Sequence, residues 1–100
     1  MNVEINQNSD KISVIVRGEL NTSTTDSFVE AMTPVFDNAA KSIEMDCSGL
    51  EYISSKGLRA ILSIQKAVGA AGGDLVLMNM TPGIRTVFDI SGFSEFIKII

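Results

Sequence analysis

Alternation of apolar and polar residues predicts short, half-buried strands in the first half of the chain. Two alternating runs are separated by the polar, turn-forming stretch 7–11, and this arrangement predicts an antiparallel hairpin. A third run begins at residue 43 and is followed by a predicted loop at 48–53. The apolar positions of the three runs are Val3 and Ile5; Ile12, Val14 and Val16; and Ile43, Met45 and Cys47.

Two strands are predicted in the second half. Leu75–Met78 is a continuous apolar run, which is typical of a strand covered on both faces. Ile97 and Ile99 flank Lys98 and predict a last, short strand at the end of the sequence.

A first helix is predicted after the loop Gly18–Thr22, because apolar residues then recur at helical spacing. Ser23 would cap this helix, with Asp26 in the position of a capping-box acid. Pro34 lies within the pattern and predicts a kink or a break, since proline removes an amide donor and crowds the preceding turn. The apolar positions of this helix are Phe28, Met32, Val35, Phe36 and Ala39.

Two further helices are predicted from the same periodicity. One follows Ser54 and ends in the small residues 69–73, as glycine commonly stops a helix. The other follows Thr81 and Pro82, a cap and a first-turn proline, and stops near Gly92. Their apolar positions are Leu58, Ile61, Leu62, Ile64 and Val68, and then Ile84, Val87, Phe88 and Ile90.

The order of these elements is strand, strand, helix, strand, helix, strand, helix, strand. Alternating strands and helices imply right-handed crossovers between parallel strands. We therefore expect one α/β domain over residues 1–100, with a mixed, mostly parallel five-strand sheet, an antiparallel edge and three short helices.

Composition excludes several classes of function. Eight Lys and Arg against twelve Asp and Glu give a net charge of −4, so the chain lacks the basic patch of a nucleic-acid-binding protein. No apolar run approaches the length of a membrane span, and the polar start is unlike a signal peptide. We expect a cytoplasmic protein that does not insert into the membrane, and a monomer when free, because no apolar stripe is evident.

The side chains for most enzyme chemistry are missing. There is no histidine, which excludes histidine-based acid–base catalysis and histidine metal sites. The single cysteine, Cys47, cannot form an internal disulfide, and its place in a strand predicts a small buried side chain. We expect no catalytic residue, metal or cofactor, and a protein that acts by binding or by being modified.

Residues 46–59 connect the end of a strand to the start of a helix, where ligands and partners usually dock in α/β sheets. If Ser54 is the N-cap, Ser55 falls in the first turn, close to free backbone amides and the positive end of the helix dipole. A phosphate on Ser55 would meet hydrogen-bond donors there. The same residues also fit a purely structural cap, and Gly57 fits either a contact surface or internal packing.

The sequence of residues 46–62, together with Gly18–Asn21, Gly72–Leu75 and Phe88–Phe93, resembles the STAS domain, and more narrowly the single-domain bacterial anti-sigma factor antagonists. The resemblance covers the whole chain and implies that Ser55 is the phosphorylated serine. Ser54 stands where the family commonly has an aspartate, and Lys56 where it has serine or threonine. If the helix started one residue away, Ser54 would be the alternative acceptor.

The resemblance implies a partner switch. The unmodified protein would bind an anti-sigma factor that is also a GHKL-type serine kinase; phosphorylation would end the complex, and a PP2C-type phosphatase would reverse it. Two alternatives are a STAS accessory module that binds a transporter or sensor complex constitutively, and a small Ser–Lys enzyme. The partner-binding residues implied are Asn21, Tyr52, Ile53, Ser54, Lys56, Gly57 and Arg59, with Ile53 fitting the core as well.

Overall fold

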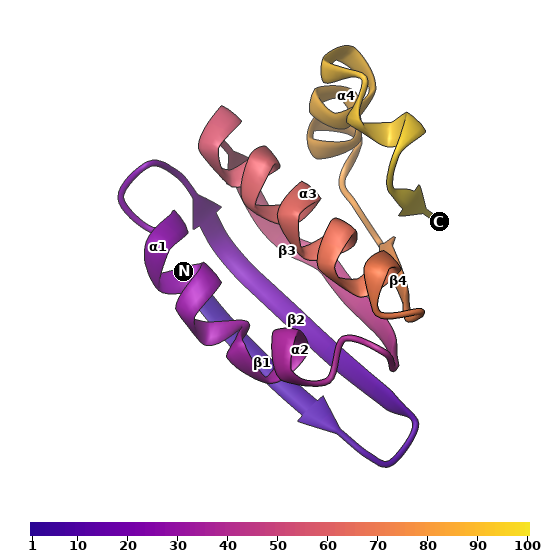
Figure 1. Cartoon of the computed structure of the whole chain (residues 1–100). Coiled ribbons are helices and arrows are strands. Elements are labelled where there is room, and N and C mark those ends of the chain that lie inside the picture. The colour runs from indigo at the N-terminus through magenta and orange to yellow at the C-terminus, as the bar shows by residue number, and fades with distance from the viewer.

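The computed structural model of residues 1–100 contains one five-stranded sheet, and its strands are adjacent in sequence order (Figure 1). The strands β1 (Asn2–Gln7) and β2 (Lys11–Leu20) form the antiparallel hairpin. The strands β3 (Ser42–Ile53), β4 (Asp74–Met78) and β5 (Lys98–Ile99) then add to β2 in parallel. The predicted α/β fold, with its mixed sheet and antiparallel edge, is confirmed.

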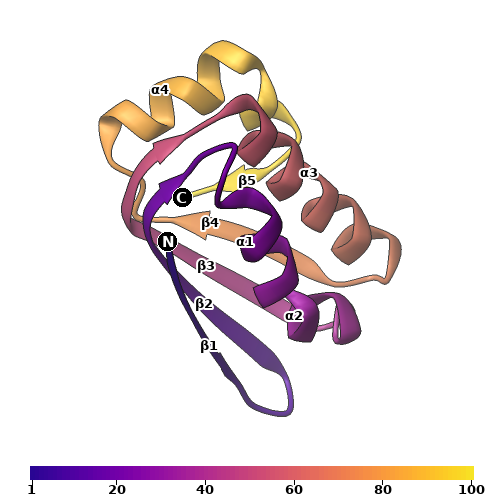
Figure 2. The same cartoon turned by 90° about the vertical axis from the view of Figure 1, so that its left-hand side faces the viewer.

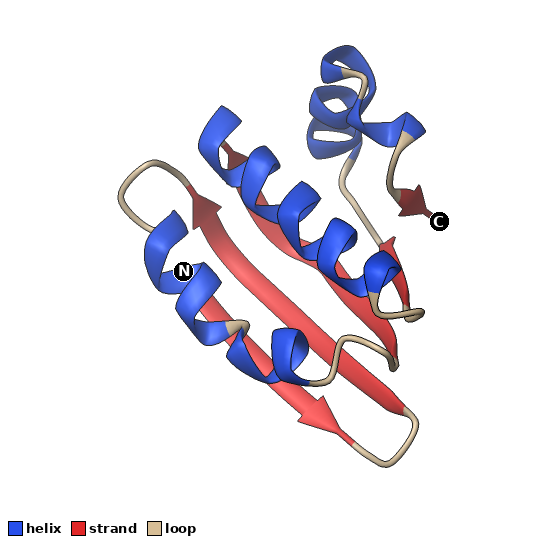
Figure 3. Cartoon of the chain, in the orientation of Figure 1, coloured by secondary structure: helices blue, strands red, loops and turns tan.

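Four α-helices are present where three were predicted (Figure 3). Pro34 is the cause, because the first predicted helix is divided into α1 (Thr25–Ala31) and α2 (Thr33–Asp37), with the proline in the first turn of α2. The other two are α3 (Ser55–Ala70) and α4 (Pro82–Ser91), and a single 3₁₀ turn, η1 (Phe93–Glu95), follows.

The helices cover one face of the sheet. Each parallel strand lies next to the one before it, so successive right-handed crossovers return on the same side. Figures 1 and 2 show α1, α2 and α3 over that face. In β4, Leu75 and Leu77 are accordingly buried and Val76 and Met78 only half-buried, so the prediction of a strand covered on both faces is wrong.

The strands β2 and β3 are longer than their alternation predicts. Gly18–Leu20 and residues 48–53 were predicted as loops, but they belong to the ends of these two strands. The register between β2 and β3 shifts after Ile15 and again after Gly18. Both shifts place an extra residue in β3, and each moves the following β3 side chains to the other face. This hid the end of β3 from a period-two pattern, whereas β2 keeps its period up to Leu20 but has no buried side chain at 17–19.

The hydrophobic core lies between the helices and the sheet and consists of 22 buried side chains. Cys47 is among them, as predicted, and burial, with the nearby charge of Asp46, raises the pKa of its thiol to about 12. None of the helices is both long enough and apolar enough to cross a membrane.

Candidate functional site

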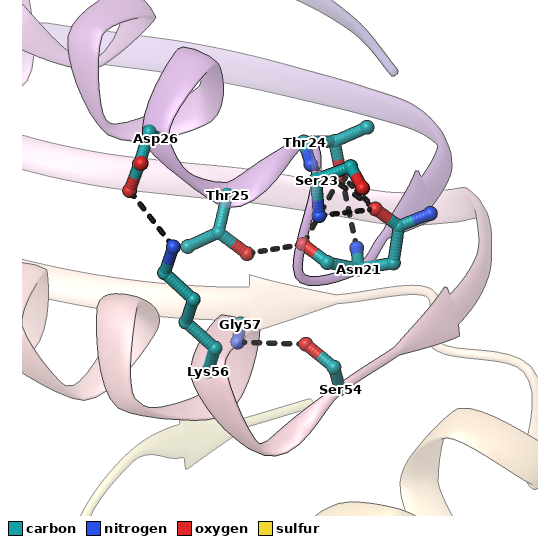
Figure 4. Close-up of polar contacts among 8 residues, drawn as sticks. All are labelled: Asn21, Ser23, Thr24, Thr25, Asp26, Ser54, Lys56 and Gly57. Atoms are coloured by element: carbon teal, nitrogen blue, oxygen red, sulfur yellow. Dashed lines mark hydrogen bonds and ion pairs between the residues drawn. The ribbon is translucent and has the colours of Figure 1, made fainter.

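The candidate site lies where β2 and β3 end together, because their residues remain paired to the last position. Tyr52 lies opposite Glu19 and Ile53 opposite Leu20, and the amide of Ser54 donates a hydrogen bond of 2.9 Å to the carbonyl of Leu20. The loop after β2 is therefore held beside the first turn of α3 (Figure 4).

Ser54 caps α3, as predicted. Its backbone is extended, and its hydroxyl oxygen accepts a hydrogen bond of 3.1 Å from the amide of Gly57. Ser55 is consequently the first residue of the helix; it is exposed, and its hydroxyl makes no hydrogen bond within the chain. A hydroxyl in this position is free to react with an outside reagent, and the free amides and dipole of the helix start favour an anion there.

Gly57 and Ile53 belong to the packing beneath the site. A methyl group at position 57 would lie 2.8 Å from Cγ of Leu20 and 2.9 Å from its carbonyl oxygen. Only glycine therefore lets α3 approach the end of β2 this closely. The side chain of Ile53 is 5% exposed, so neither residue offers a side-chain surface to a partner.

The loop after β2 is organised by Asn21. Its side-chain oxygen accepts hydrogen bonds from the amides of Ser23 (2.9 Å) and Thr24 (3.0 Å). The hydroxyl of Thr24 accepts from the amide of Asn21 and donates to the carbonyl of Glu19, and the buried Thr25 donates to the carbonyl of Asn21. These bonds fix the loop, leaving Asn21 half-buried with its side-chain nitrogen unbonded.

The predicted capping box of α1 is wrong. The N-cap is Thr24, not Ser23, and no side chain caps the helix, because the hydroxyl of Thr24 is engaged in the loop. Asp26 instead forms an ion pair of 3.1 Å with Lys56, which joins the first turns of α1 and α3 (Figure 4). Sequence reasoning missed this role of Asp26; the only signal was a lysine in a first helical turn, where the dipole disfavours it.

Besides the half-buried Ser54, whose hydroxyl caps α3, four side chains from the predicted set are at least partly exposed around Ser55. Tyr52, at the end of β3, is 49% exposed; Arg59 is exposed one turn into α3; and Asn21 and Lys56 are half-buried. We call Asn21, Tyr52, Ser55, Lys56 and Arg59 the switch surface. It combines an aromatic ring, two cations and an unbonded hydroxyl, a set suited to protein contact and to modification.

The STAS domain family matches residues 2–100. BtrV of Bordetella bronchiseptica, named as a candidate anti-sigma factor antagonist, is 31% identical over 84 residues, which are 84% of this chain and 72% of BtrV. The anti-sigma-B factor antagonist of Bacillus subtilis is 28% identical over 99 residues, which are 99% of this chain and 90% of that protein.

The fold is shared with solved structures of anti-sigma factor antagonists. SpoIIAA in its unphosphorylated form has a TM-score of 0.80 and 19% identity, over 99% of this chain and 88% of that one. Bacillus SpoIIAA in the phosphorylated form has a TM-score of 0.73, again at 19% identity, over 99% and 91% of the two chains. At this identity the likeness shows the fold.

Proposed function

We propose that this chain, which belongs to the STAS domain family and is similar to anti-sigma factor antagonists, binds an anti-sigma factor through the switch surface and is released when Ser55 is phosphorylated. The observation that carries the proposal is the exposed, unbonded hydroxyl of Ser55 at the start of α3. The solved phosphorylated form of SpoIIAA supports it, because that protein has the same fold.

The phosphoryl transfer is a simple exchange of bonds. The hydroxyl oxygen of Ser55 attacks the γ-phosphorus of ATP, the bond to the β-phosphate oxygen breaks, ADP leaves, and the serine proton passes to a base of the kinase. We propose that the anti-sigma factor is itself this serine kinase, of the GHKL type. A PP2C-type phosphatase would hydrolyse the phosphoserine and restore the hydroxyl.

Phosphorylation would leave the fold intact and change the surface. The added group carries about −1.5 to −2 charges at neutral pH, and the start of α3 accommodates negative charge. Inside an interface, however, the same charge would have to lose its water, which is expensive unless the partner supplies a matching cation. A modification that the free protein tolerates would therefore oppose the complex.

The two departures from the family pattern have structural explanations. Ser54 caps α3 because its hydroxyl oxygen accepts a hydrogen bond from a first-turn amide. An aspartate carboxylate at an N-cap accepts the same hydrogen bond. Lys56 is paired with Asp26, so much of its charge is balanced. Neither replacement blocks access to Ser55, which supports Ser55 as the acceptor.

Intact-mass analysis after incubation with the cognate kinase and ATP tests the proposal. We expect the wild type to gain one phosphate, Ser55→Ala to gain none while still binding the kinase, and Ser54→Ala to be labelled like the wild type. Phosphate on Ser54 in the Ser55→Ala variant would move the acceptor to Ser54. Stable binding without any phosphate would instead favour a constitutive STAS accessory module of a transporter or sensor complex.

A further inference from the structure

Arg59 is a cation without an acidic partner, one turn after Ser55. Arg17 pairs with Glu4, Arg85 pairs with Asp89, and Lys56 pairs with Asp26. Arg59 is exposed, and no carboxylate lies within ion-pair distance of its guanidinium. It is therefore the only arginine of the chain whose charge is not matched within the fold.

Residues 55 and 59 both lie in α3, four positions apart. At this spacing two side chains occupy the same face of the helix, with their Cβ atoms about 5–6 Å from each other. A negative group that precedes a positive one by four residues has the favourable orientation in a helix. Arginine also matches phosphate geometrically, since its planar fork donates two parallel hydrogen bonds.

We propose that Arg59 binds the phosphate of modified Ser55 within the same chain. Phosphorylation then changes the switch surface twice: it adds negative charge, and it withdraws Arg59 from contact with the partner. The inference rests on the proposed function for the origin of the phosphate, whereas the contact itself follows from the position of the two residues in α3.

The other charged groups near Ser55 are less suited to this contact. Lys56 is adjacent to Ser55, and adjacent residues of a helix do not face each other; its ammonium is also held by Asp26. Glu51 in β3 and Glu19 in β2 are acids, which repel a phosphate. The amides of the first turn of α3 also favour the dianion, but substitution of Arg59 leaves them in place.

Phosphorus NMR of a chain carrying genetically encoded phosphoserine at position 55 tests the contact without any kinase. Arg59 stabilises the dianion, so we expect the second pKa of the phosphate to be about 0.3 units lower with Arg59 than in Arg59→Gln. Arg59→Lys should restore part of the shift, because it keeps the charge but loses the fork. Equal pKa values with and without the Arg59 charge would overturn the proposal.

Lys66→Gln is the matched control. Lys66 is an exposed cation of the same helix with no acidic partner, and eleven residues at 1.5 Å each place it about 16 Å from position 55. Its removal changes the net charge equally, so a shift as large as that of Arg59→Gln would mean a general charge effect and would contradict the contact.

A thermal double-mutant cycle of Ser55→Glu and Arg59→Gln gives a second, modification-free measurement. We expect the loss of Arg59 to lower the melting temperature more in the Ser55→Glu variant than in the wild type. Equal losses in the two backgrounds would contradict the contact, as equal pKa values of the phosphate would. Failure of the kinase to label Ser55 rejects the proposed function instead, and the NMR result does not depend on that labelling.

Discussion

The helices α3 and α4 begin in the same way but differ in what supports their first turns. Both follow a parallel strand, and both are capped by a hydroxyl: Ser54 accepts from the amide of Gly57 at 3.1 Å, and Thr81 from the amide of Ile84 at 3.5 Å. The next residue is an exposed serine in α3 and a proline in α4. A capped start is therefore common to both helices, whereas a modifiable group is found only in α3.

The glycine of each first turn shows the second difference. Gly57 lies against Leu20, so the start of α3 is fixed to the end of β2 beside the Asn21 loop. Gly83 has open space where a methyl group would be. At the site, the first turn of α3 therefore packs closely against β2, while its first side chain, Ser55, is exposed to solvent.

The largest contrast is expected from adding one methyl group to each glycine. Gly57→Ala should destabilise the protein by about 1–3 kcal/mol, because the methyl group meets a backbone carbonyl that cannot easily move. Gly83→Ala should be neutral or stabilising by up to about 1 kcal/mol, since alanine favours a helix. Urea unfolding of both variants measures the difference; equal changes would mean that α3 is not seated as described.

The two caps are expected to differ in the same direction. Ser54→Ala should cost about 1 kcal/mol, which is typical of a lost N-cap. Thr81→Ala should cost less, about 0.5 kcal/mol, because its hydrogen bond is long and correspondingly weak. Free energies of unfolding for the two variants check this, with Ser55→Ala as the neutral control; a larger loss at Thr81 would contradict the ranking.

These helix starts could be predicted from the sequence, since capping residues and periodicity act within a few residues of each other. Ser54 and Thr81 were placed correctly for this reason. The cap of α1 was predicted at the wrong residue. The N-cap is Thr24, and its hydroxyl is hydrogen-bonded within the Asn21 loop and does not cap the helix. The hydroxyl of Thr24 donates to the carbonyl of Glu19 in the preceding strand. The local sequence pattern around the helix start does not indicate this hydrogen bond.

The parts that could not be predicted depend on pairing between distant segments. The final residues of β2 and β3 were assigned to loops. In β3, the register shifts move the buried Leu50 out of the period-two phase of the preceding buried positions. In β2, the phase continues to Leu20, but residues 17–19 carry no buried side chain, so the alternation is interrupted. For the site, exposure of Ser55 followed from the cap. For Gly57 and Ile53 the sequence left both a packing role and a contact role open, and the burial of Ile53 and the close approach of Gly57 to Leu20 decide for packing. The ion pair of Asp26 and Lys56 likewise joins residues 30 positions apart.

The ion pair between α1 and α3 should contribute less than the caps. A double-mutant cycle of Asp26→Asn and Lys56→Gln is expected to give a coupling of about 0.5 kcal/mol, since Asp26 is largely exposed and the ammonium of the half-buried Lys56 still reaches solvent. The coupling should decrease in high salt. Unfolding experiments at low and high ionic strength measure it, and a coupling that does not respond to salt would contradict an exposed pair.

The smallest effect is expected in α4, which holds an i,i+4 ion pair in the less favourable order, with the cation before the anion, the reverse of the pair proposed for phosphorylated α3. The hydrogen bond from Arg85 lowers the pKa of the Asp89 carboxyl. A lowered pKa stabilises the fold above the ordinary aspartate pKa, and the benefit is lost as the pH falls through the folded pKa. Asp89→Asn should therefore lower the melting temperature slightly at pH 7, and the difference from wild type should shrink below about pH 4. A difference that grows in acid would have the wrong sign.

Affinity for the cognate anti-sigma kinase, measured by calorimetry, tests the central claim most directly. The wild type, Ser55→Ala and the chain with encoded phosphoserine at position 55 should be titrated at one salt concentration. We predict that the first two bind alike and that the phosphoserine chain loses most of its affinity, while its circular dichroism is unchanged. A folded phosphoserine chain that binds as tightly as the wild type would contradict a switch at Ser55.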